Sequence, residues 1–350
     1  MSLDALPDAP ADSTTGAGWL RLGLRLVFLG LLVSAAHQVI TQSIRHAEVG
    51  QFGVWNRIVE GRINVQLLIS GSSRALNHYD PRILQATTGR TAFNIGLNGS
   101  QTDMQLARLK TYLAHNAKPD LIVQNLDLFS LQMTHGAAYD AGQYTPYLDQ
   151  PALFDALRRI QPSAWKSKYL PLYGYAVDDT RFTWLEGLAA AAGRPRVDDR
   201  FLGFMPRDLP WTSDFDRFKS SHLNGVKVDI EPEGVEQLRS LVRLCQERQI
   251  SLLLVYSPEY REMQNLTTNR REIFDLFAQL AREQGIALWD YSADPLSTDR
   301  SAFYNSQHLN AQGAARFSAS LAERIRKEFP AVDTVPWSDL SGKVGAGGRS

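Results

Sequence analysis

Short runs of apolar residues alternate with long amphipathic segments from about residue 65 to residue 330. Five runs have the length and composition of buried strands in a parallel sheet: Val65–Ser70, Ala92–Ile95, Leu121–Leu126, Ser251–Ser257 and Ala287–Tyr291. Four segments have the 3.6-residue apolar period of helices: Thr102–Asn116, Pro232–Gln249, Arg270–Gln284 and Ala311–Phe329. This alternation predicts an α/β fold with a doubly wound, flavodoxin-like parallel sheet of about five strands.

Another apolar segment, residues 18–41, lies near the N-terminus. Counted from Trp19, with Arg21 and Arg25 reaching toward the headgroups, it spans roughly 20 residues. We predict a transmembrane signal anchor that crosses a bacterial inner membrane once. These two arginines, at the front of the segment, place the N-terminus inside and the rest of the chain in the periplasm. Ser34-Ala35-Ala36 would also suit signal-peptide cleavage, and a buried globular helix is a third interpretation.

The rest of the chain divides by composition. Residues 1–17 and 331–350 are predicted to be disordered tails, and the mixed, polar residues 42–64 a stalk. The main domain is predicted at 65–330, with an insertion at about 128–230 that is too long for a simple crossover. The insertion carries Trp165, Trp184 and Trp211, which favours either a lid or sugar-binding subdomain or a local core of its own.

Charge and cysteine content exclude several classes of function. The chain has 350 residues, with 37 basic and 37 acidic side chains and no basic stripe, so nucleic acid is not an expected partner. Cys245, the single cysteine, lies in an apolar helical segment and is predicted to be buried, without a disulfide in the chain. We find no phosphate-binding glycine loop and no metal-ligand spacing among the histidines, so neither a cofactor nor a metal is expected.

Two segments far apart in the sequence carry the candidate chemistry. Ser73 follows the first predicted strand, and His308 precedes the last predicted helix. In an open α/β sheet both positions lie at the carboxyl edge, where such folds bind ligands. A serine beside a histidine is typical of acyl chemistry. Taken singly, Ser73 could be a helix-capping serine and His308 a capping or core histidine, and Asn310 is a good N-cap for the last helix.

The pattern resembles the SGNH (GDSL-type) hydrolase superfamily over about residues 65–127 and 250–328. Gly71-Ser72-Ser73 corresponds to the family's first motif, and His308-Leu309-Asn310 followed by Gly313 corresponds to its last. Within the superfamily, the chain resembles the membrane-anchored branch around polysaccharide O-acetyltransferases. That branch includes the alginate acetylation proteins and, more distantly, the D-alanine transfer protein of teichoic acid synthesis.

The resemblance implies a role for each matching residue. Ser73 would be the nucleophile and His308 the general base. The family's oxyanion-hole glycine corresponds most closely to Gly99, with Gly96 as the alternative. Asn125 is the candidate for its oxyanion-hole asparagine, although the glycine that precedes this asparagine in the family is missing here.

One position departs from the family. The aspartate three residues before the histidine is Asn305 in this chain. In serine proteases, replacing the corresponding aspartate with asparagine costs about 10⁴ in turnover. Asn305 could still orient His308 through its side-chain oxygen, or Asp299 or Asp294 could supply the charge. Asp290 is interpreted as structural.

These features predict an exported, membrane-anchored serine O-acyltransferase, expected to acetylate a cell-surface or exported polysaccharide. Its expected partners are the polysaccharide acceptor and a multi-span membrane acyltransferase as acyl donor, because nothing in the sequence could bind acetyl-CoA. A carbohydrate esterase or deacetylase on the same scaffold is the first alternative. A non-catalytic polysaccharide-binding assembly subunit is the second, and Asn305 makes it credible.

Overall fold

The computed structural model describes residues 14–177, 185, 188–189, 192–194 and 200–330. The predicted C-terminal tail, residues 1–13 of the predicted N-terminal tail, and part of the predicted insertion, including Trp184, lie outside the described residues. Residues 14–17 belong to a helix, because α1 begins at Thr14.

A five-stranded parallel sheet forms the centre of the molecule and confirms the predicted fold class. The strands are β1 (Leu67–Ser70), β2 (Ala92–Asn94), β3 (Leu121–Asn125), β4 (Ser251–Tyr256) and β5 (Ala287–Asp290). Their order is β2-β1-β3-β4-β5, with neighbours in parallel register. This is the flavodoxin-like order, in which the strand order reverses beside β1 and ligands bind at the carboxyl edge.

Alternate residues of each strand face two separate apolar cores. Leu68, Ile122 and Leu254 belong to one core, and Ile69 and Leu253 to the other. Because successive side chains of a strand point to opposite faces, both sheet faces must be covered by helices. That requirement explains the nearly continuous apolar runs in the sequence.

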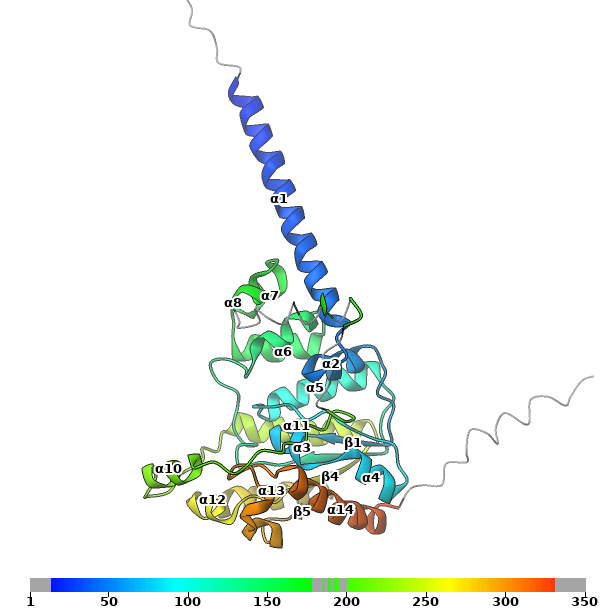
Figure 1. The fold of residues 1–350 in the computed structure, drawn as a ribbon, viewed down its shortest axis with the longest axis vertical. Coiled ribbons are helices and arrows are strands. Elements are labelled where there is room, and N and C mark those ends of the chain that lie inside the picture. The colour runs from blue at the N-terminus through cyan, green and yellow to red at the C-terminus, as the bar shows by residue number, and fades with distance from the viewer. Residues whose placement is uncertain (1–13, 178–184, 186–187, 190–191, 195–199, 331–350) are drawn as a thin grey trace, which may run out of the picture.

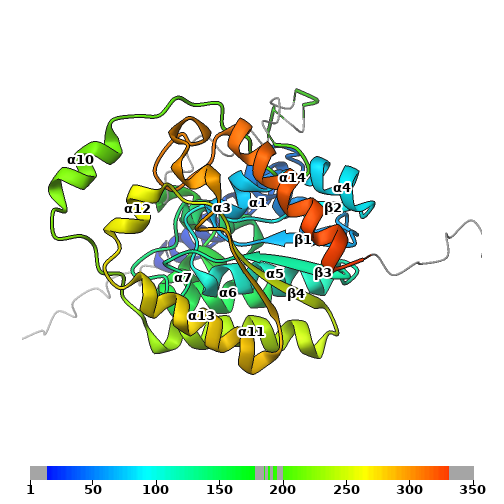
Figure 2. The ribbon, with the colours of Figure 1, turned by 90° about the horizontal axis from the view of Figure 1, so that it is seen from below.

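Helices cover both faces, as Figure 2 shows. The helices α5 (Thr102–His115), α11 (Pro232–Glu247) and α13 (Arg270–Gln284) pack on one face, and α4 (Pro81–Thr88) and α14 (Ala311–Glu328) pack on the other. Pro232 stands at the first turn of α11 and Gly285 ends α13 in the left-handed conformation, both as expected. Cys245 is fully buried in the core on the α11 side.

The apolar helix α1 (Thr14–Arg45) projects from the domain (Figure 1). From Gly18 onward it is long and apolar enough to cross a membrane, a property that signal sequences share, and its apolar side chains from Trp19 to Leu32 are exposed. Its last turns join the domain. Ile44 is fully buried, and the Arg45 guanidinium lies 2.7 Å from the Asp149 carboxylate.

The predicted stalk at 42–64 is wrong. These residues include the end of α1 and the helix α2 (Gly50–Val59), and Trp55 and Ile58 of α2 are fully buried. The Asn56 amide donates to the carbonyl oxygens of Ile44 and Ala47, which ties the connection between α1 and α2 to the core. The buried apolar residues of α2 are spaced three and four residues apart, as in an amphipathic helix: Phe52, Val54, Trp55 and Ile58.

The chain between β3 and α11 forms short helices that pack mainly against the domain. They are η1 (Ala141–Tyr147), α6 (Pro151–Ile160), α7 (Ala164–Tyr169), α8 (Tyr173–Val177) and α10 (Asp214–Ser221). Tyr147 stacks on Trp55 at 5.5 Å between ring centroids, and Leu153 of α6 is fully buried. For this part of the predicted insertion, the structure therefore favours the local-core interpretation over the lid. Trp165 remains partly exposed, and Trp211 packs on Tyr260.

Three further short elements lie near the carboxyl edge of the sheet. They are α12 (Arg261–Leu266), after β4, and η2 (Pro295–Thr298) and η3 (Arg300–Ala302), between β5 and α14. The helix α3 (Ser73–His78) follows β1 at the same edge.

Candidate active site

Ser73 lies on the turn between β1 and α3, at the first residue of α3. The chain reverses at Gly71, whose φ of 141° and whose contact with Asn125 leave no room for a side chain: an added Cβ would lie 2.9 Å from the Asn125 Cβ. Ser72 caps α3 by accepting a hydrogen bond from the Arg74 N–H at 3.2 Å. Because Ser72 performs the capping, the Ser73 hydroxyl is left for another role.

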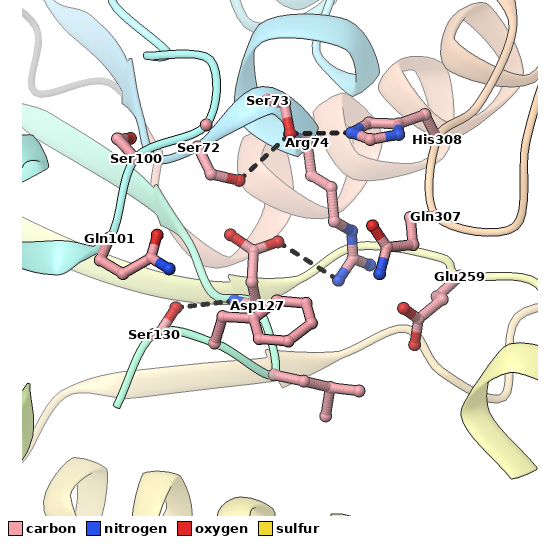
Figure 3. A pocket seen from close by; sticks show the side chains of 13 residues that line it. Ser72, Ser73, Arg74, Ser100, Gln101, Asp127, Ser130, Glu259, Gln307 and His308 are labelled. Carbon is pink, nitrogen blue, oxygen red and sulfur yellow. Dashed lines mark hydrogen bonds and ion pairs between the residues drawn. The ribbon is translucent and has the colours of Figure 1, made fainter. Parts of the chain in front are cut away.

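His308 lies on the loop before α14, two residues ahead of the N-cap Asn310. Its Nε2 is 2.8 Å from the Ser73 Oγ, although 235 residues separate the two in sequence (Figure 3). Both side chains are partly buried. The pairing predicted from the sequence is therefore present in the structure, within the distance that a general base needs to accept the serine proton.

Asn305 fixes the tautomer of His308. Its Oδ1 accepts hydrogen bonds from the backbone N–H groups of Gln307 and His308, at 3.0 and 2.9 Å. Since only the amide oxygen can accept, these two bonds determine which side-chain atom faces the imidazole. The same Oδ1 is 2.9 Å from His308 Nδ1, so Nδ1 carries the proton and Nε2 is left bare toward Ser73. This is the tautomer a general base requires.

The environment keeps the His308 imidazole neutral. Burial, together with the positive charges of Arg74 and Arg207, lowers its pKa to about 3. Tyr304 stacks against the ring, with 5.4 Å between centroids and an interplanar angle of 12°. Because Asn305 carries no charge, it does not oppose these effects as an aspartate would.

A second histidine, His78, joins the segments that carry Ser73 and His308. It is fully buried on α3, and its Nε2 accepts the Leu309 N–H at 3.0 Å. Its Nδ1 therefore donates to the Ser257 Oγ, at 2.8 Å. These bonds hold the His308 loop against α3 and β4. The sequence offered no signal for this role, because the partners are distant in the chain.

Gly99 lines the cavity beside Ser73, as expected for the oxyanion-hole glycine. Within the described residues, neither its N–H nor that of Ser73 has a hydrogen-bond partner. The N–H of Gly96, the alternative, already donates to the Asn94 Oδ1 at 2.8 Å. The geometry therefore favours Gly99 and the Ser73 amide as oxyanion donors.

The structure contradicts the predicted role of Asn125. This residue is fully buried at the end of β3 and does not line the cavity. Its Oδ1 accepts from the Tyr79 hydroxyl at 2.6 Å, and its Nδ2 donates to the Leu126 carbonyl and to Asp127, both at 3.1 Å. With both ends of the amide engaged, Asn125 has no donor left for an oxyanion.

The two alternative acids also have other partners. Asp294 caps η2 through the Leu296 N–H at 2.9 Å. Asp299 accepts from Ser301 at 2.5 Å and pairs with Arg316 at 2.6 Å. The place beside His308 Nδ1 is taken by Asn305, so neither aspartate supplies the missing charge. Asp290 accepts from the Ser292 N–H at the end of β5, in keeping with its structural interpretation.

A cavity of about 210 Å³ opens in front of the Ser73–His308 pair (Figure 3). Its lining is mostly polar: Ser72, Ser73, Arg74, Gly99, Ser100, Gln101, Asp127, Leu128, Phe129, Ser130, Glu259, Gln307 and His308. Sequence reasoning did not assign Gln101, Asp127, Glu259 or Gln307 to the site. They come from four separate loops, which only the folded sheet brings together.

The floor of this cavity is a buried charge network. The Arg74 guanidinium lies 3.4 Å from Asp127, covers the Tyr256 ring at 4.4 Å, and donates to the Ser257 carbonyl. Glu259 accepts from the Tyr256 hydroxyl at 2.6 Å. Burial raises the pKa of Asp127 and of Glu259, and Arg74 partly offsets the increase. One fixed cation therefore holds two carboxylates within reach of a substrate.

The described part of the chain shows no arrangement suited to a metal, since no three His, Cys, Asp or Glu side chains converge there. His135 contacts Glu231 and His222 stacks on Phe218, both away from the cavity.

Comparison with known proteins gives distant structural likenesses. No family model matches the chain, and no curated protein matches it. One similar solved structure is a protein assigned to the G-D-S-L lipolytic family from Desulfitobacterium hafniense DCB-2, at 11% identity and a TM-score of 0.37, covering 74% of this chain and 98% of that one.

Two others come from Bacteroides. A protein assigned as an acylhydrolase from Bacteroides fragilis NCTC 9343 has 11% identity and a TM-score of 0.32, over 74% of this chain and 86% of its own. A GDSL-like lipase from Bacteroides thetaiotaomicron VPI-5482 has 10% identity and a TM-score of 0.31, over 74% and 87%. With TM-scores this low, the likenesses assign neither a family nor an activity to this chain.

Proposed function

We propose that this chain is a serine-dependent acyl-transfer enzyme in which Ser73 is the nucleophile and His308 the general base. The observation that carries the proposal is the 2.8 Å contact between Ser73 Oγ and His308 Nε2, with the tautomer set by Asn305. A capping serine and a core histidine would not need this contact. The amides of Ser73 and Gly99, which have no hydrogen-bond partner among the described residues, supply the third element of acyl-transfer sites.

The reaction follows from these positions. His308 Nε2 accepts the Ser73 proton as Oγ attacks the ester carbonyl, and the N–H groups of Ser73 and Gly99 bind the resulting oxyanion. Each such donor is worth roughly 3 kcal/mol in the transition state. His308 returns the proton to the leaving alcohol, which leaves an acyl group on Ser73. An incoming hydroxyl, deprotonated by His308, then attacks the acyl carbonyl and takes the acyl group, and His308 returns the proton to the Ser73 Oγ.

The cavity supports a short acyl group and a hydroxyl-bearing acceptor. Its polar lining suits sugar hydroxyls, which donate hydrogen bonds to carboxylates such as Asp127 and Glu259, and does not suit a long acyl chain. We therefore propose O-acetyl transfer to a cell-surface or exported polysaccharide. When water replaces the sugar, the same site is a carbohydrate esterase, which is the alternative function.

The proposal includes a membrane location. The exposed apolar face of α1 supports an anchor, and Arg21 and Arg25 near its start favour an N-terminus inside the inner membrane and a domain in the periplasm. Acetyl groups would then reach Ser73 from a multi-span membrane acyltransferase. Protease digestion of intact spheroplasts tests this orientation, because a periplasmic domain is degraded and a cytoplasmic one is protected.

The function is tested by mixing the full chain, in non-ionic detergent, with 4-nitrophenyl acetate and a short sugar oligomer. Ser73→Ala and His308→Ala are compared with Ser72→Ala, which removes a neighbouring hydroxyl that caps α3 but leaves the nucleophile. Nitrophenol release that needs Ser73 and His308, with acetate on the sugar, supports transfer. Release without a sugar product supports the esterase. Equal inertness of the wild type and the variants, with sugar binding retained, would favour the non-catalytic assembly subunit.

A further inference from the structure

A second cavity, of about 260 Å³, lies beside the candidate active site and is lined by three arginines, Arg108, Arg200 and Arg207. Leu76 of α3 and the segment Gly96–Asn98 form the wall nearest the catalytic residues, and Gln51 of α2 forms part of another. None of these side chains takes part in the acyl-transfer mechanism above. Among the described residues of this lining, Asp140 is the only acidic one.

Arg108 is the most unusual residue of this cavity. It is 1% exposed, and its Nε and Nη2 have no hydrogen-bond partner among the described residues. Its guanidinium lies over the Trp55 ring, 4.6 Å from the centroid, and no carboxylate in the described part of the chain forms an ion pair with it. A buried charge without a partner is costly, and proteins retain one mainly where a ligand completes it.

Neighbouring positive charge increases that cost. Burial and the charge of Arg200 lower the pKa of Arg108 to about 9, so the two guanidiniums lie close enough to repel each other. Arg207 is partly exposed at the rim. The Asp140 carboxylate accepts from the Gln51 amide at 3.0 Å. Arg108 and Arg207 therefore present positive charge to this cavity, and a bound anion would neutralise the Arg108 charge.

We propose that this cavity binds a phosphate-class oxyanion. Guanidinium groups match the oxygens of phosphate in a two-pronged arrangement, and Arg108 offers two buried nitrogens, Nε and Nη2, that have no hydrogen-bond partner among the described residues. The volume far exceeds what a single water needs, so a phosphate ester fits as well as the free ion. The proposal is independent of acyl transfer at Ser73.

The same chemistry has two possible sources. Gly50 and Gln51 line the cavity only a few residues after α1 ends at Arg45, and Figure 1 places α2 directly at the base of that helix. A phospholipid headgroup could therefore enter, and so could the phosphate of a soluble sugar or glycerol ester. Both would present the same oxygens to Arg108 and Arg207.

An anion bound in this cavity would also affect His308, the proposed general base. Arg207 is one of the two arginines whose charge disfavours protonation of His308. An anion on Arg207 offsets part of that charge and makes His308 a stronger base. We therefore expect phosphate to change the turnover of 4-nitrophenyl acetate at constant pH.

The test uses the full chain in non-ionic detergent and phosphate-free buffer. Inorganic phosphate and glycerol phosphate are titrated by calorimetry, and nanodiscs of neutral lipid are compared with nanodiscs containing phosphatidylglycerol. We expect saturable binding of at least one of these probes, weakened about tenfold or more in Arg207→Gln. Arg243→Gln, on the exposed face of α11, is the matched control and should bind as the wild type does.

Arg108→Met separates a ligand role from a structural one. Removing an unpaired buried charge should leave the unfolding temperature in phosphate-free buffer unchanged or raise it, and should abolish the stabilisation that phosphate gives the wild type. A large fall in that temperature without phosphate would assign Arg108 a structural role and overturn the proposal. So would the absence of saturable binding of every probe, or equal weakening by Arg207→Gln and Arg243→Gln. If glucuronate binds more tightly than phosphate, the cavity is a carboxylate site and the phosphate assignment is wrong.

Discussion

Asn305 stands where the family that the sequence resembles has an aspartate. It differs from that aspartate in charge more than in how its side-chain oxygen orients His308. Its Oδ1 accepts from two backbone N–H groups and from His308, so the imidazole is held in the productive tautomer. What is missing is the negative charge that would stabilise the imidazolium formed during attack. We therefore interpret the site as oriented but electrostatically weakened.

Asn305→Asp should restore that charge without disturbing the geometry, because a carboxylate oxygen accepts the same three donors. We expect turnover of 4-nitrophenyl acetate to rise by about one to two orders of magnitude. Asn310→Asp is the control for added charge, since aspartate still accepts from the Gly313 N–H and loses only the amide donor to the Ser301 carbonyl. Unchanged turnover in Asn305→Asp would mean that another group already stabilises the imidazolium.

The pH dependence of the wild type tests the same point. His308 acts as a base only when neutral, and activity is lost as the pH falls through its pKa. Because burial, Arg74 and Arg207 lower that pKa from 6.5 to about 3, we expect kcat/KM to stay nearly level as the pH falls from about 8 to about 4. A fall in kcat/KM centred near pH 6.5 in the wild type would contradict the low pKa of His308. In Asn305→Asp, the fall in kcat/KM should move to higher pH.

Gly99 is constrained in both conformation and space. Its φ is 61°, and an added Cβ would lie 2.4 Å from the Tyr139 Cγ. Gly99→Ala should displace the oxyanion donor and lower kcat by up to about 100-fold. Gly136→Ala is a matched control, because Gly136 has a φ of 72° but open space around its Cβ position. Equal activity of both variants would remove Gly99 from the oxyanion hole.

At the level of elements, the positions of Ser73 and His308 depend on contact between α3 and the loop before α14. His78 supplies that contact through its bonds to Leu309 and Ser257. The sequence was sufficient to predict which turns carry Ser73 and His308, because both sit at boundaries marked by strong strand and helix patterns. The contacts between those turns depend on the folded chain and were not predictable.

His78→Phe keeps an aromatic ring of similar shape and removes both hydrogen bonds. We expect the free energy of unfolding to fall by about 1–3 kcal/mol and kcat to fall more than KM changes. His115→Phe, at the exposed end of α5, should have neither effect. A kcat unaffected by His78→Phe would show that the loop is positioned by other contacts.

Two of the predictions from the sequence fail at this scale, and both failures have physical causes. The predicted stalk contains few consecutive apolar residues, but Phe52, Trp55 and Ile58 share one face of α2 and are buried. From the sequence, Asn125 is the candidate for the family's asparagine although the preceding glycine is missing, but in the structure Tyr79 and Asp127 take up its amide. In both cases the outcome depends on partners contributed by distant segments, which a local pattern does not contain.

At the scale of the whole molecule, α1 is continuous from the apolar segment into the folded domain. Its exposed apolar turns lie beyond the domain, whereas Ile44 and Arg45 are joined to it (Figure 1). A membrane-inserted α1 would therefore hold the domain close to the bilayer surface rather than on a flexible stalk.

Leu29→Arg tests the membrane role of α1. A charged residue near the centre of a spanning helix costs roughly 2.5–3.5 kcal/mol, so we expect a clear shift of the full chain from the membrane pellet to the soluble fraction. Leu223→Arg introduces the same charge at a side chain that is 86% exposed in the domain and should leave the distribution unchanged. If Leu29→Arg also leaves it unchanged, α1 does not anchor the chain.

The central claim is that Ser73 carries the acyl group, and the most direct measurement is the mass of the peptide that contains it. The full chain is mixed briefly with 4-nitrophenyl acetate, quenched with acid, digested and analysed by mass spectrometry. We expect an acetyl group on Ser73 in the wild type and in Ser72→Ala, and none in Ser73→Ala. Nitrophenol release with the acetyl group on another residue, or equal release by Ser73→Ala, would contradict the account.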